Sequence, residues 1–302
     1  MSEQITTVGE YFDALTAAFV GSDPAVAQDA LYDAQEFLAG EREALGAAGM
    51  NADDELELVN RLMQRFGQPS EVVESYRTTE AQVAAALAPP AIPPAQGLIG
   101  QIFGVFVDPR TYGALFFMLV SLPLGIIYFT WAVTGLSLSL GLSVLIFGLA
   151  FFLLFISSVR AVALVECRII EALLGERMPR RPAMVLPRGG WISRVKFYLT
   201  DPRTWLTILY MVLCLPLGIL YFTIATVFLS LALTLPLAPF AQLLFDYPIV
   251  QIFDNKYFLP LWSFPFLGVA GGIAMLMIMH IARGVGRWHA WLAKSMLARP
   301  GY

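Results

Sequence analysis

The sequence predicts an all-α protein: a small cytosolic helical domain followed by a four-span transmembrane helical domain. The first observation is composition, because 58% of the 302 residues are hydrophobic and the mean hydropathy is +0.68, whereas soluble domains carry about 45–50% apolar residues. The second is a set of four long, nearly uncharged stretches. The third is an internal repeat, since the segment Asp108 to Thr130 returns ninety-three residues later as Asp201 to Thr223.

The chain is therefore expected to divide into a helical head, a linker and a membrane body built from two parallel-oriented repeats. The expected boundaries are 1–80 for the acidic head, 81–97 for the Ala/Pro linker, 98–302 for the body, and 98–189 and 190–302 for its repeats. Proline pairs in the linker favour extended backbone and a semi-rigid spacer.

Helix signals recur through the head. One apolar stripe follows the spacing of four, three and four residues in Val8, Phe12, Leu15 and Phe19. Asp23 and Pro24 supply an N-cap and a proline at the first position of a second helix. In that helix Asp29, Asp33 and Glu36 are expected to face water. Two further helices are predicted over 51–66 and 70–77.

The charges are divided unevenly between the head and the body. Residues 1–88 hold sixteen Asp and Glu against four Arg, and the remainder holds fifteen Arg and Lys against seven acids. An acidic head is repelled by nucleic acid and attracted to basic surfaces, including the loops of its own body. The composition argues against direct nucleic-acid binding.

The head resembles the HAAS signalling domain, a compact helical module of bacterial membrane-anchored proteins. The resemblance lies in Tyr11, Phe12 and Leu15, in the acidic second helix ending near Leu38, and in the closing pattern from Phe66 to Arg77. It implies a regulatory head, and a transcriptional regulator of the PadR type as a cytosolic partner. The family motif contains no catalytic residues.

Four spans are predicted in the body, each long enough to cross about 30 Å of hydrocarbon. The segment 160–203 carries nine Arg and Lys, the tail from Arg283 carries four, and the segments expected outside carry only Lys256. The positive-inside rule places both chain ends in the cytosol. The expected location is the inner membrane, which the chain crosses several times. The expected spans are 111–133, 137–159, 204–227 and 264–282.

The body resembles the sensor domain of actinobacterial and related signalling proteins, which is often joined to a histidine kinase. The residues that carry the resemblance are Asp-Pro-Arg-Thr at 108 and 201, Leu-Pro-Leu-Gly-Ile at 122 and 215, and the arginines that end the returning spans. The sequence up to Tyr302 shows no phosphoacceptor helix and no ATP-binding domain, so we expect the output to pass through the head or a partner.

Arginines near the expected cytosolic face are candidates for contact with lipid headgroups or with the acidic head. They are Arg110 and Arg203 in the repeated motif and Arg177, Arg180 and Arg181 in the central loop. The first two also have a structural explanation, in which Asp and Pro start a helix and Arg reaches phosphate. The repeated Leu-Pro-Leu-Gly predicts a kink packed against the other repeat, or a hinge, at Pro123, Gly125, Pro216 and Gly218.

The second repeat contains about thirty extra residues around 235–264, expected outside the membrane and rich in aromatic residues. Such a segment is either an interfacial belt or a surface that senses an amphiphile or envelope component. The candidates for external sensing are Asp246, Tyr247, Asp254, Lys256 and Tyr257.

No catalytic constellation is recognisable, so we expect no enzyme activity and no cofactor. Met275, Met277 and Met279 fall on two faces of a helix, which argues against a metal site. No buried carboxylate is expected within the spans, which weakens a proton-coupled transporter. His289 is expected in an interfacial tail helix beside Trp288.

The sequence thus favours a membrane signalling or regulatory protein that senses a membrane or envelope cue and relays it through its head. The alternative is a membrane-assembly or lipid-handling subunit of a larger complex. The expected partners are membrane lipid and either a cytosolic regulatory protein or another membrane protein, with a second copy of the chain as a further candidate.

Overall fold

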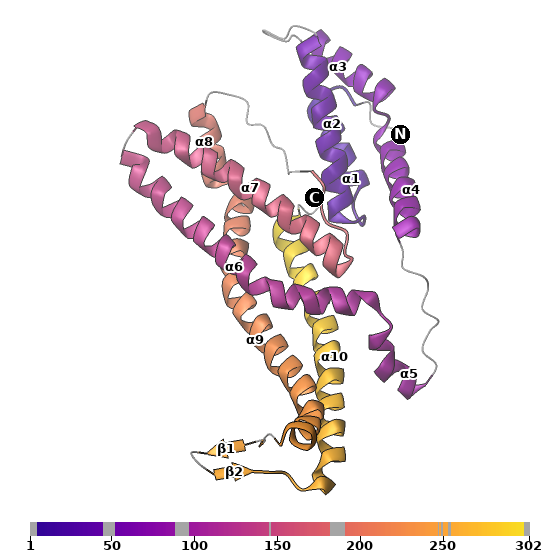
Figure 1. Cartoon of the computed structure of the whole chain (residues 1–302). Helices are drawn as coiled ribbons and strands as arrows, with labels where there is room; N and C mark the ends of the chain where they lie inside the picture. Colours follow the sequence, from indigo (N-terminus) through magenta and orange to yellow (C-terminus); the bar gives the residue numbers. More distant parts are fainter. Residues whose placement is uncertain are drawn as a thin grey trace.

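The computed structural model describes residues 5–44, 52–87, 97–144, 146–181, 191–246, 248, 250–252 and 255–298. It is helical throughout apart from one short hairpin of strands, which confirms the predicted fold class. Figure 1 shows a small helical head lying beside one end of a body made of long helices. Four helices of the body are long and apolar enough to cross a membrane.

The head contains four helices that enclose their own apolar core. The chain enters through a capping box in which Thr7 Oγ1 accepts from the Glu10 amide and Glu10 accepts from the Thr7 amide. Tyr11 is fully buried, and its hydroxyl donates to the Gly67 carbonyl at 2.7 Å. The helices are α1 (Val8–Ala18), α2 (Pro24–Ala44), α3 (Ala52–Arg65) and α4 (Pro69–Leu87).

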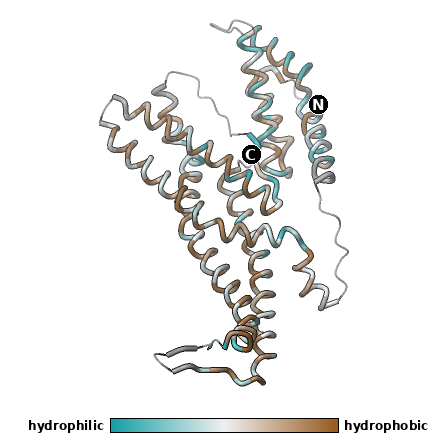
Figure 2. Tube along the Cα trace, in the orientation of Figure 1, coloured by the Kyte–Doolittle hydropathy of each residue, from teal (hydrophilic) through white to brown (hydrophobic). Residues whose placement is uncertain are grey.

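The body consists of two helical hairpins, each preceded by a short helix. The first comprises α5 (Leu98–Phe103), η1 (Gly104–Phe106), α6 (Pro109–Gly141), η2 (Leu142–Val144) and α7 (Ile146–Leu174). The second comprises α8 (Trp191–Thr200), α9 (Pro202–Phe245), η3 (Leu261–Ser263) and α10 (Phe264–Leu297). Large apolar side chains are exposed along these helices, as lipid contact requires. Figure 2 shows the apolar residues along them.

The repeated Asp-Pro-Arg motif starts the first long helix of each hairpin as predicted. Asp108 Oδ1 accepts from the Arg110 amide at 3.0 Å, and Asp201 Oδ1 accepts from the Arg203 amide at 3.2 Å. Proline follows at the first helical position, where no amide hydrogen bond is lost.

The two first helices, α6 and α9, cross in close contact at the repeated Leu-Pro-Leu-Gly. A Cβ added to Gly125 would lie 2.5 Å from the Cys214 carbonyl oxygen, and one added to Gly218 would lie 2.4 Å from that of Ser121. Only glycine lets the backbones approach this closely. The two contacts are reciprocal, because Gly218 and Cys214 follow Gly125 and Ser121 by the same ninety-three residues.

The helices extend beyond the predicted spans. The second span was expected to end at 159, but α7 continues to Leu174, past Arg160. The third was expected to end at 227, but α9 reaches Phe245 with Pro236 and Pro239 inside it. Arginine marks a hydrocarbon boundary but does not end a helix, since its charge can be paired or reach the interface.

The segment after α9 is hydrogen-bonded to that helix. Strands β1 (Val250–Ile252) and β2 (Asn255–Tyr257) pair antiparallel, with Val250 opposite Tyr257. The Gln242 side chain accepts from the Leu259 amide at 2.9 Å and donates to its carbonyl at 2.8 Å. The insertion therefore begins with about three further turns of α9, over residues 235–245, and continues in a short hairpin.

Candidate functional site

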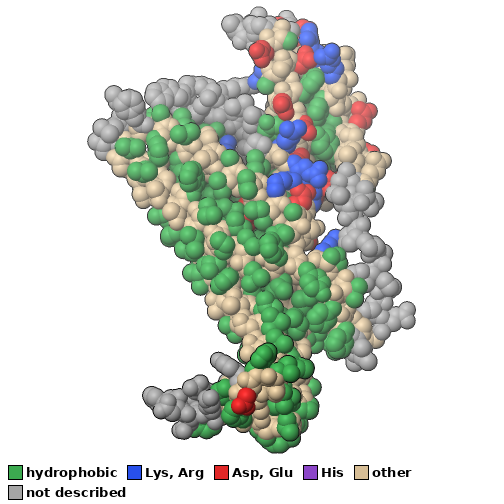
Figure 3. Space-filling model, viewed as in Figure 1, with side chains coloured by type: hydrophobic (Ala, Val, Ile, Leu, Met, Phe, Trp, Pro, Cys, Tyr) green, Lys and Arg blue, Asp and Glu red, His purple; other side chains and the backbone are tan. Residues whose placement is uncertain are grey.

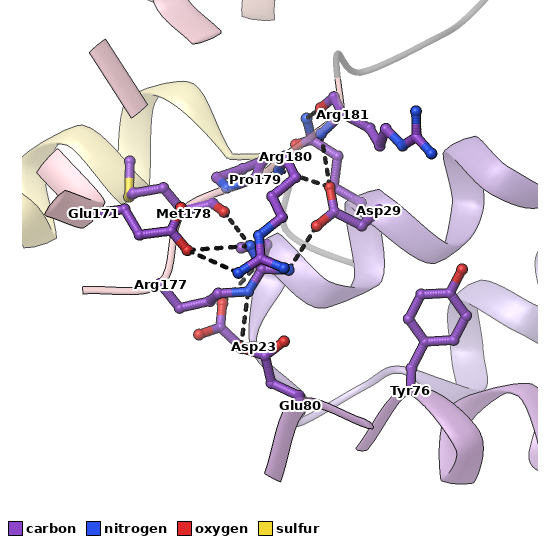
Figure 4. A network of polar contacts seen from close by, with 12 residues as sticks. Asp23, Asp29, Tyr76, Glu80, Glu171, Arg177, Met178, Pro179, Arg180 and Arg181 are labelled. Atoms are coloured by element: carbon purple, nitrogen blue, oxygen red, sulfur yellow. Dashed lines mark hydrogen bonds and ion pairs between the residues drawn. The ribbon is translucent and has the colours of Figure 1, made fainter. Parts of the chain in front are cut away.

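The head rests on the body through a buried carboxylate on α2, Asp29. One of its oxygens accepts from Arg177 Nη2 at 2.7 Å, and the other accepts from the backbone amides of Arg180 and Arg181, both at 2.8 Å. Figure 4 shows these residues around Asp29. Asp29 is 6% exposed, so its predicted position on the wet face of α2 was wrong. A single carboxylate thus binds three donors from the segment that follows α7.

Further polar contacts surround this docking carboxylate. Arg177 Nε lies 2.9 Å from Glu80 of α4, and Arg181 Nε lies 3.3 Å from Asp33. The Arg180 side chain turns away from the head and pairs with Glu171 of α7 at 3.3 Å. In Figure 3, blue and red side chains gather where the head meets the body. We call Asp29, Glu80, Arg177, Arg180 and Arg181 the docking junction.

A second contact joins the head to the other hairpin. Lys294 Nζ, near the end of α10, lies 2.6 Å from Asp23 Oδ2. Asp23 also caps α2, where its other carboxylate oxygen accepts from the Ala25 amide at 2.9 Å. The N-terminal part of α2 is therefore attached to the ends of both returning helices, α7 and α10.

A buried polar cluster lies inside the body where four long helices meet. Glu166 of α7 accepts from the hydroxyls of Tyr128 (α6) and Tyr210 (α9) at 2.8 and 2.9 Å. His289 of α10 lies 3.0 Å from the Tyr210 hydroxyl through Nε2 and 3.4 Å from the Tyr221 hydroxyl through Nδ1. We call these five residues the core cluster.

The direction of the hydrogen bond between Tyr210 and His289 follows from Glu166. The Tyr210 hydroxyl donates to Glu166, so the hydrogen between Tyr210 and His289 belongs to Nε2 of the imidazole. Nδ1 lies 3.4 Å from the Tyr221 hydroxyl, so both ring nitrogens of His289 have a hydroxyl partner. Glu166 and His289 are 3% and 2% exposed. The expectation that the spans lack a buried carboxylate was therefore wrong, and the His289 side chain packs between helices of the body and does not face lipid.

The cluster joins equivalent positions of the two repeats. Tyr128 and Tyr221 are ninety-three residues apart, like the aspartates of the helix starts. Glu166 and His289 are separated by 123 residues, as are the arginines at 160 and 283 of the same returning helices. A cavity of about 10 Å³ lies among the cluster side chains, which is room for one water molecule.

Crossed ion pairs link the repeats near the helix starts. Arg283 of α10 lies 3.5 Å from Asp108 of α6, and Arg160 of α7 lies 4.0 Å from Asp201 of α9. Each pair joins the returning helix of one repeat to the first helix of the other. Such reciprocity is what a twofold relation between two copies produces.

The remaining candidate residues fall into three groups. Arg203 donates to the Ala298 carbonyl at 3.2 Å, just beyond α10, whereas the Arg110 side chain lines a surface cavity. Pro123 and Pro216 lie inside α6 and α9. In the external segment Asp246 adopts a left-handed backbone conformation that ends α9. Tyr257 is exposed, and the Lys256 backbone pairs with that of Gln251. Tyr247 and Asp254 lie outside the described residues.

Sequence reasoning missed the residues that form both polar centres. One signal was present in the sequence. Glu166 interrupts an apolar run within α7, and the equivalent position of the other returning helix holds His289. The docking carboxylate gave no local signal, because its partners are about 150 residues away in the sequence. Within the described part of the chain no three His, Cys, Asp or Glu side chains converge as metal ligands, and Cys167 and Cys214 are free and buried.

The fold and these contacts define a multi-pass helical membrane protein whose soluble head is docked on a duplicated body. The chain matches the family described as "Sensor: Putative sensor" over residues 117–297, and it belongs to that family. The match covers the core cluster and the crossing of α6 and α9, and the head lies outside it. No curated protein and no solved structure matches the chain.

Proposed function

We propose that the protein is a membrane sensor whose two repeats control the docking of the head. One observation carries the proposal: α2 is held by both returning helices, through Asp29 on Arg177 and Asp23 on Lys294. The same two helices carry Glu166 and His289 of the core cluster. Any cue that moves one repeat against the other therefore changes the spacing of the two points that hold the head.

The transmission runs along rigid elements. On the α7 side the helix is continuous from Glu166 to Leu174, and Arg177 follows three residues later. On the α10 side Lys294 follows His289 by five residues within one helix. Packed interfaces switch between discrete arrangements, so a small shift at the cluster can release the head. The glycine crossing and the prolines of α6 and α9 supply the pivot.

The proposed orientation leaves the head and both chain ends in the cytosol. The positive-inside rule supports it, because the arginines of the docking junction lie on the side predicted to be cytosolic. The cue then reaches the protein from the lipid or from the external segment 246–263, with Asp246 and Tyr257 available there for an amphiphile or an envelope component. The inner membrane is the proposed location.

The released head is the proposed output. Undocking exposes the α2 face that carries Asp29 and Asp33, an acidic surface suited to a basic patch on a cytosolic regulatory protein. The HAAS resemblance of the head supports this role and favours a PadR-type regulator as the partner. The protein itself carries out no catalysis in this scheme and does not contact nucleic acid directly.

Hydrogen exchange on the full chain in lipid nanodiscs tests the proposal. Asp29→Asn weakens the junction, so α2 and residues 176–181 should exchange faster than in the wild type. Asp13→Asn removes the same charge from an exposed position of α1 and serves as the control. Equal exchange of α2 in both variants and the wild type would contradict control by docking.

Crosslinking in native membranes separates this proposal from the alternative function. The sensor proposal expects Asp29→Asn to increase crosslinks between the head and a soluble cytosolic protein. Recovery of the same integral membrane complex with the wild type and both variants, at unchanged yield, would instead favour a membrane-assembly role.

A further inference from the structure

A cavity of about 250 Å³ opens on the body beside the start of α6, the second half of α10 and the end of α7. It is lined by three arginines and two carboxylates together with small and apolar residues. The charged lining residues are Arg110, Arg283, Arg287, Asp108 and Glu176. The lining therefore has an excess of positive charge.

Two of the three arginines are available to a ligand. Arg283 pairs with Asp108, which also caps α6. The guanidinium groups of Arg110 and Arg287 have neither a hydrogen bond nor an ion pair to any residue that the structure describes, and both side chains are exposed. Glu176 is exposed as well, and its carboxylate is the second negative charge in the lining.

The second repeat contains an equivalent but smaller cavity, which we call the head-covered copy. It measures about 60 Å³ and is lined by Arg160, Asp201 and Arg203, the counterparts of Arg283, Asp108 and Arg110. Gln28 of the head also lines it. One geometry thus occurs twice, and among the described residues the head lines one copy and not the other.

The arginines of the head-covered copy already have partners within the chain. Arg203 donates to the carbonyl of Ala298, and the guanidinium of Arg160 lies 4.5 Å above the ring of Tyr198. The position equivalent to Arg287 holds Leu164. The cavity at the start of α6 therefore differs from the head-covered copy by an added arginine. It differs also because Arg110 and Arg287 have no hydrogen bond or ion pair from their side chains to the described residues.

Exposed aromatic residues place the cavity at the start of α6 at the depth of lipid headgroups. Trp288 and Trp291, on the same part of α10 as Arg287, are 46% and 65% exposed, and Tyr112 of α6 is 50% exposed. Aromatic side chains concentrate at the interface between hydrocarbon and water. Arginine there binds phosphate through paired N–H donors.

We propose that this cavity binds the phosphate of an anionic phospholipid headgroup through Arg110 and Arg287. Phosphate oxygens accept from both guanidinium groups, while the acyl chains lie along the apolar face of α6 and α10. The site goes beyond the proposed function, because it assigns a ligand to the cytosolic end of the interface between the repeats.

Native mass spectrometry of the full chain in detergent tests the assignment, with phosphatidylglycerol, phosphatidylcholine and inorganic phosphate as probes. Each basic residue near a membrane surface contributes roughly a fivefold gain in affinity for anionic lipid. The variant Arg110→Gln/Arg287→Gln should therefore bind phosphatidylglycerol about 25-fold more weakly. Its affinity for phosphatidylcholine should not change.

Two further variants make the result unambiguous. Arg287→Leu reproduces the head-covered copy at one position and should bind phosphatidylglycerol about fivefold more weakly. This single variant tests the proposal if the double variant fails to fold. Arg65→Gln removes a charge from the head and should bind as the wild type does.

Equal affinity of wild type and Arg287→Leu for phosphatidylglycerol would overturn the proposal. Inorganic phosphate binding that is lost in the variants, without a preference for phosphatidylglycerol over phosphatidylcholine, would assign the cavity to a soluble anion and overturn the lipid assignment.

Discussion

Glu166 and His289 occupy equivalent positions of the two repeats and face each other with Oε1 and Nε2 3.8 Å apart. Three tyrosine hydroxyls complete their hydrogen bonds. An acid and an imidazole thus meet at the interface on which the proposed repeat movement depends. Ionisable residues inside a membrane protein are costly and usually serve a function.

Removing the Glu166 carboxylate should destabilise the body. Glu166→Ala leaves the hydroxyls of Tyr128 and Tyr210 without an acceptor, which costs about 1–3 kcal/mol for each. Glu166→Gln keeps an acceptor oxygen and should cost less. Thermal unfolding in detergent, followed by circular dichroism, measures both. Equal midpoints for the alanine and glutamine variants would show that the hydroxyls have other acceptors.

Adding one methyl group at the crossing of α6 and α9 should separate the repeats. Gly125→Ala and Gly218→Ala each place a Cβ within about 2.5 Å of a backbone carbonyl of the other helix, and we expect a loss of about 1–3 kcal/mol. The two losses should be similar because the contacts are reciprocal. Gly272→Ala, where nothing lies within 4 Å of the added atom, is the control in unfolding experiments. A loss confined to one of the two crossing variants would contradict the reciprocity.

The two attachments of the head should differ in strength. Asp29 and Arg177 are 8% and 16% exposed at the side chain, and breaking such a buried pair costs about 3–5 kcal/mol. Lys294 and Asp23 are 23% and 32% exposed, so Lys294→Gln should cost about 1 kcal/mol or less. Hydrogen exchange of α2 reports both changes. Faster exchange in Lys294→Gln than in Asp29→Asn would reverse this ranking.

The head should lose stability in acid through Glu41. Hydrogen bonds from Arg61 and then Arg65 lower the pKa of this carboxyl below its ordinary value of 4.5. Its contribution is therefore present above pH 4.5 and is lost as the pH falls through the lower pKa of the folded head. Glu41→Gln should be less stable than the wild type at pH 7, and the difference should shrink below pH 4.5. Pulsed hydrogen exchange of α2 and α3 measures the difference in stability between the variant and the wild type. A difference that does not depend on pH would count against the contribution of Glu41 and its two arginines.

Much of the fold follows from local signals. The Asp-Pro starts of α6 and α9 and the apolar stripe of α1 depend on neighbouring residues, so the sequence shows them directly. The ends of the spans do not follow from local signals. Arg160 was taken as a boundary, yet α7 continues because Arg160 is paired with Asp201 and stacked on Tyr198. Both partners come from the other repeat.

The polar centres depend on contacts that no local pattern encodes. Asp29 has the spacing of a solvent-facing residue within α2, and only the segment after α7 buries it. The donors to Glu166 come from α6 and α9. Aligning the two returning helices with an offset of 123 residues would have paired Glu166 with His289. This is the one signal from which the core cluster could have been predicted.

Covalent fusion of the two copies explains how an acid can face a base at that interface. Two identical chains that associate around a twofold axis present the same side chain to each other, so glutamate would meet glutamate at this depth, and the like charges would repel. A single polypeptide carrying both halves escapes that restriction, because each half mutates separately. The pairing of an acid with an imidazole at the centre thus requires two halves of different sequence, which the tandem repeat supplies and two separate hairpins with one sequence could not.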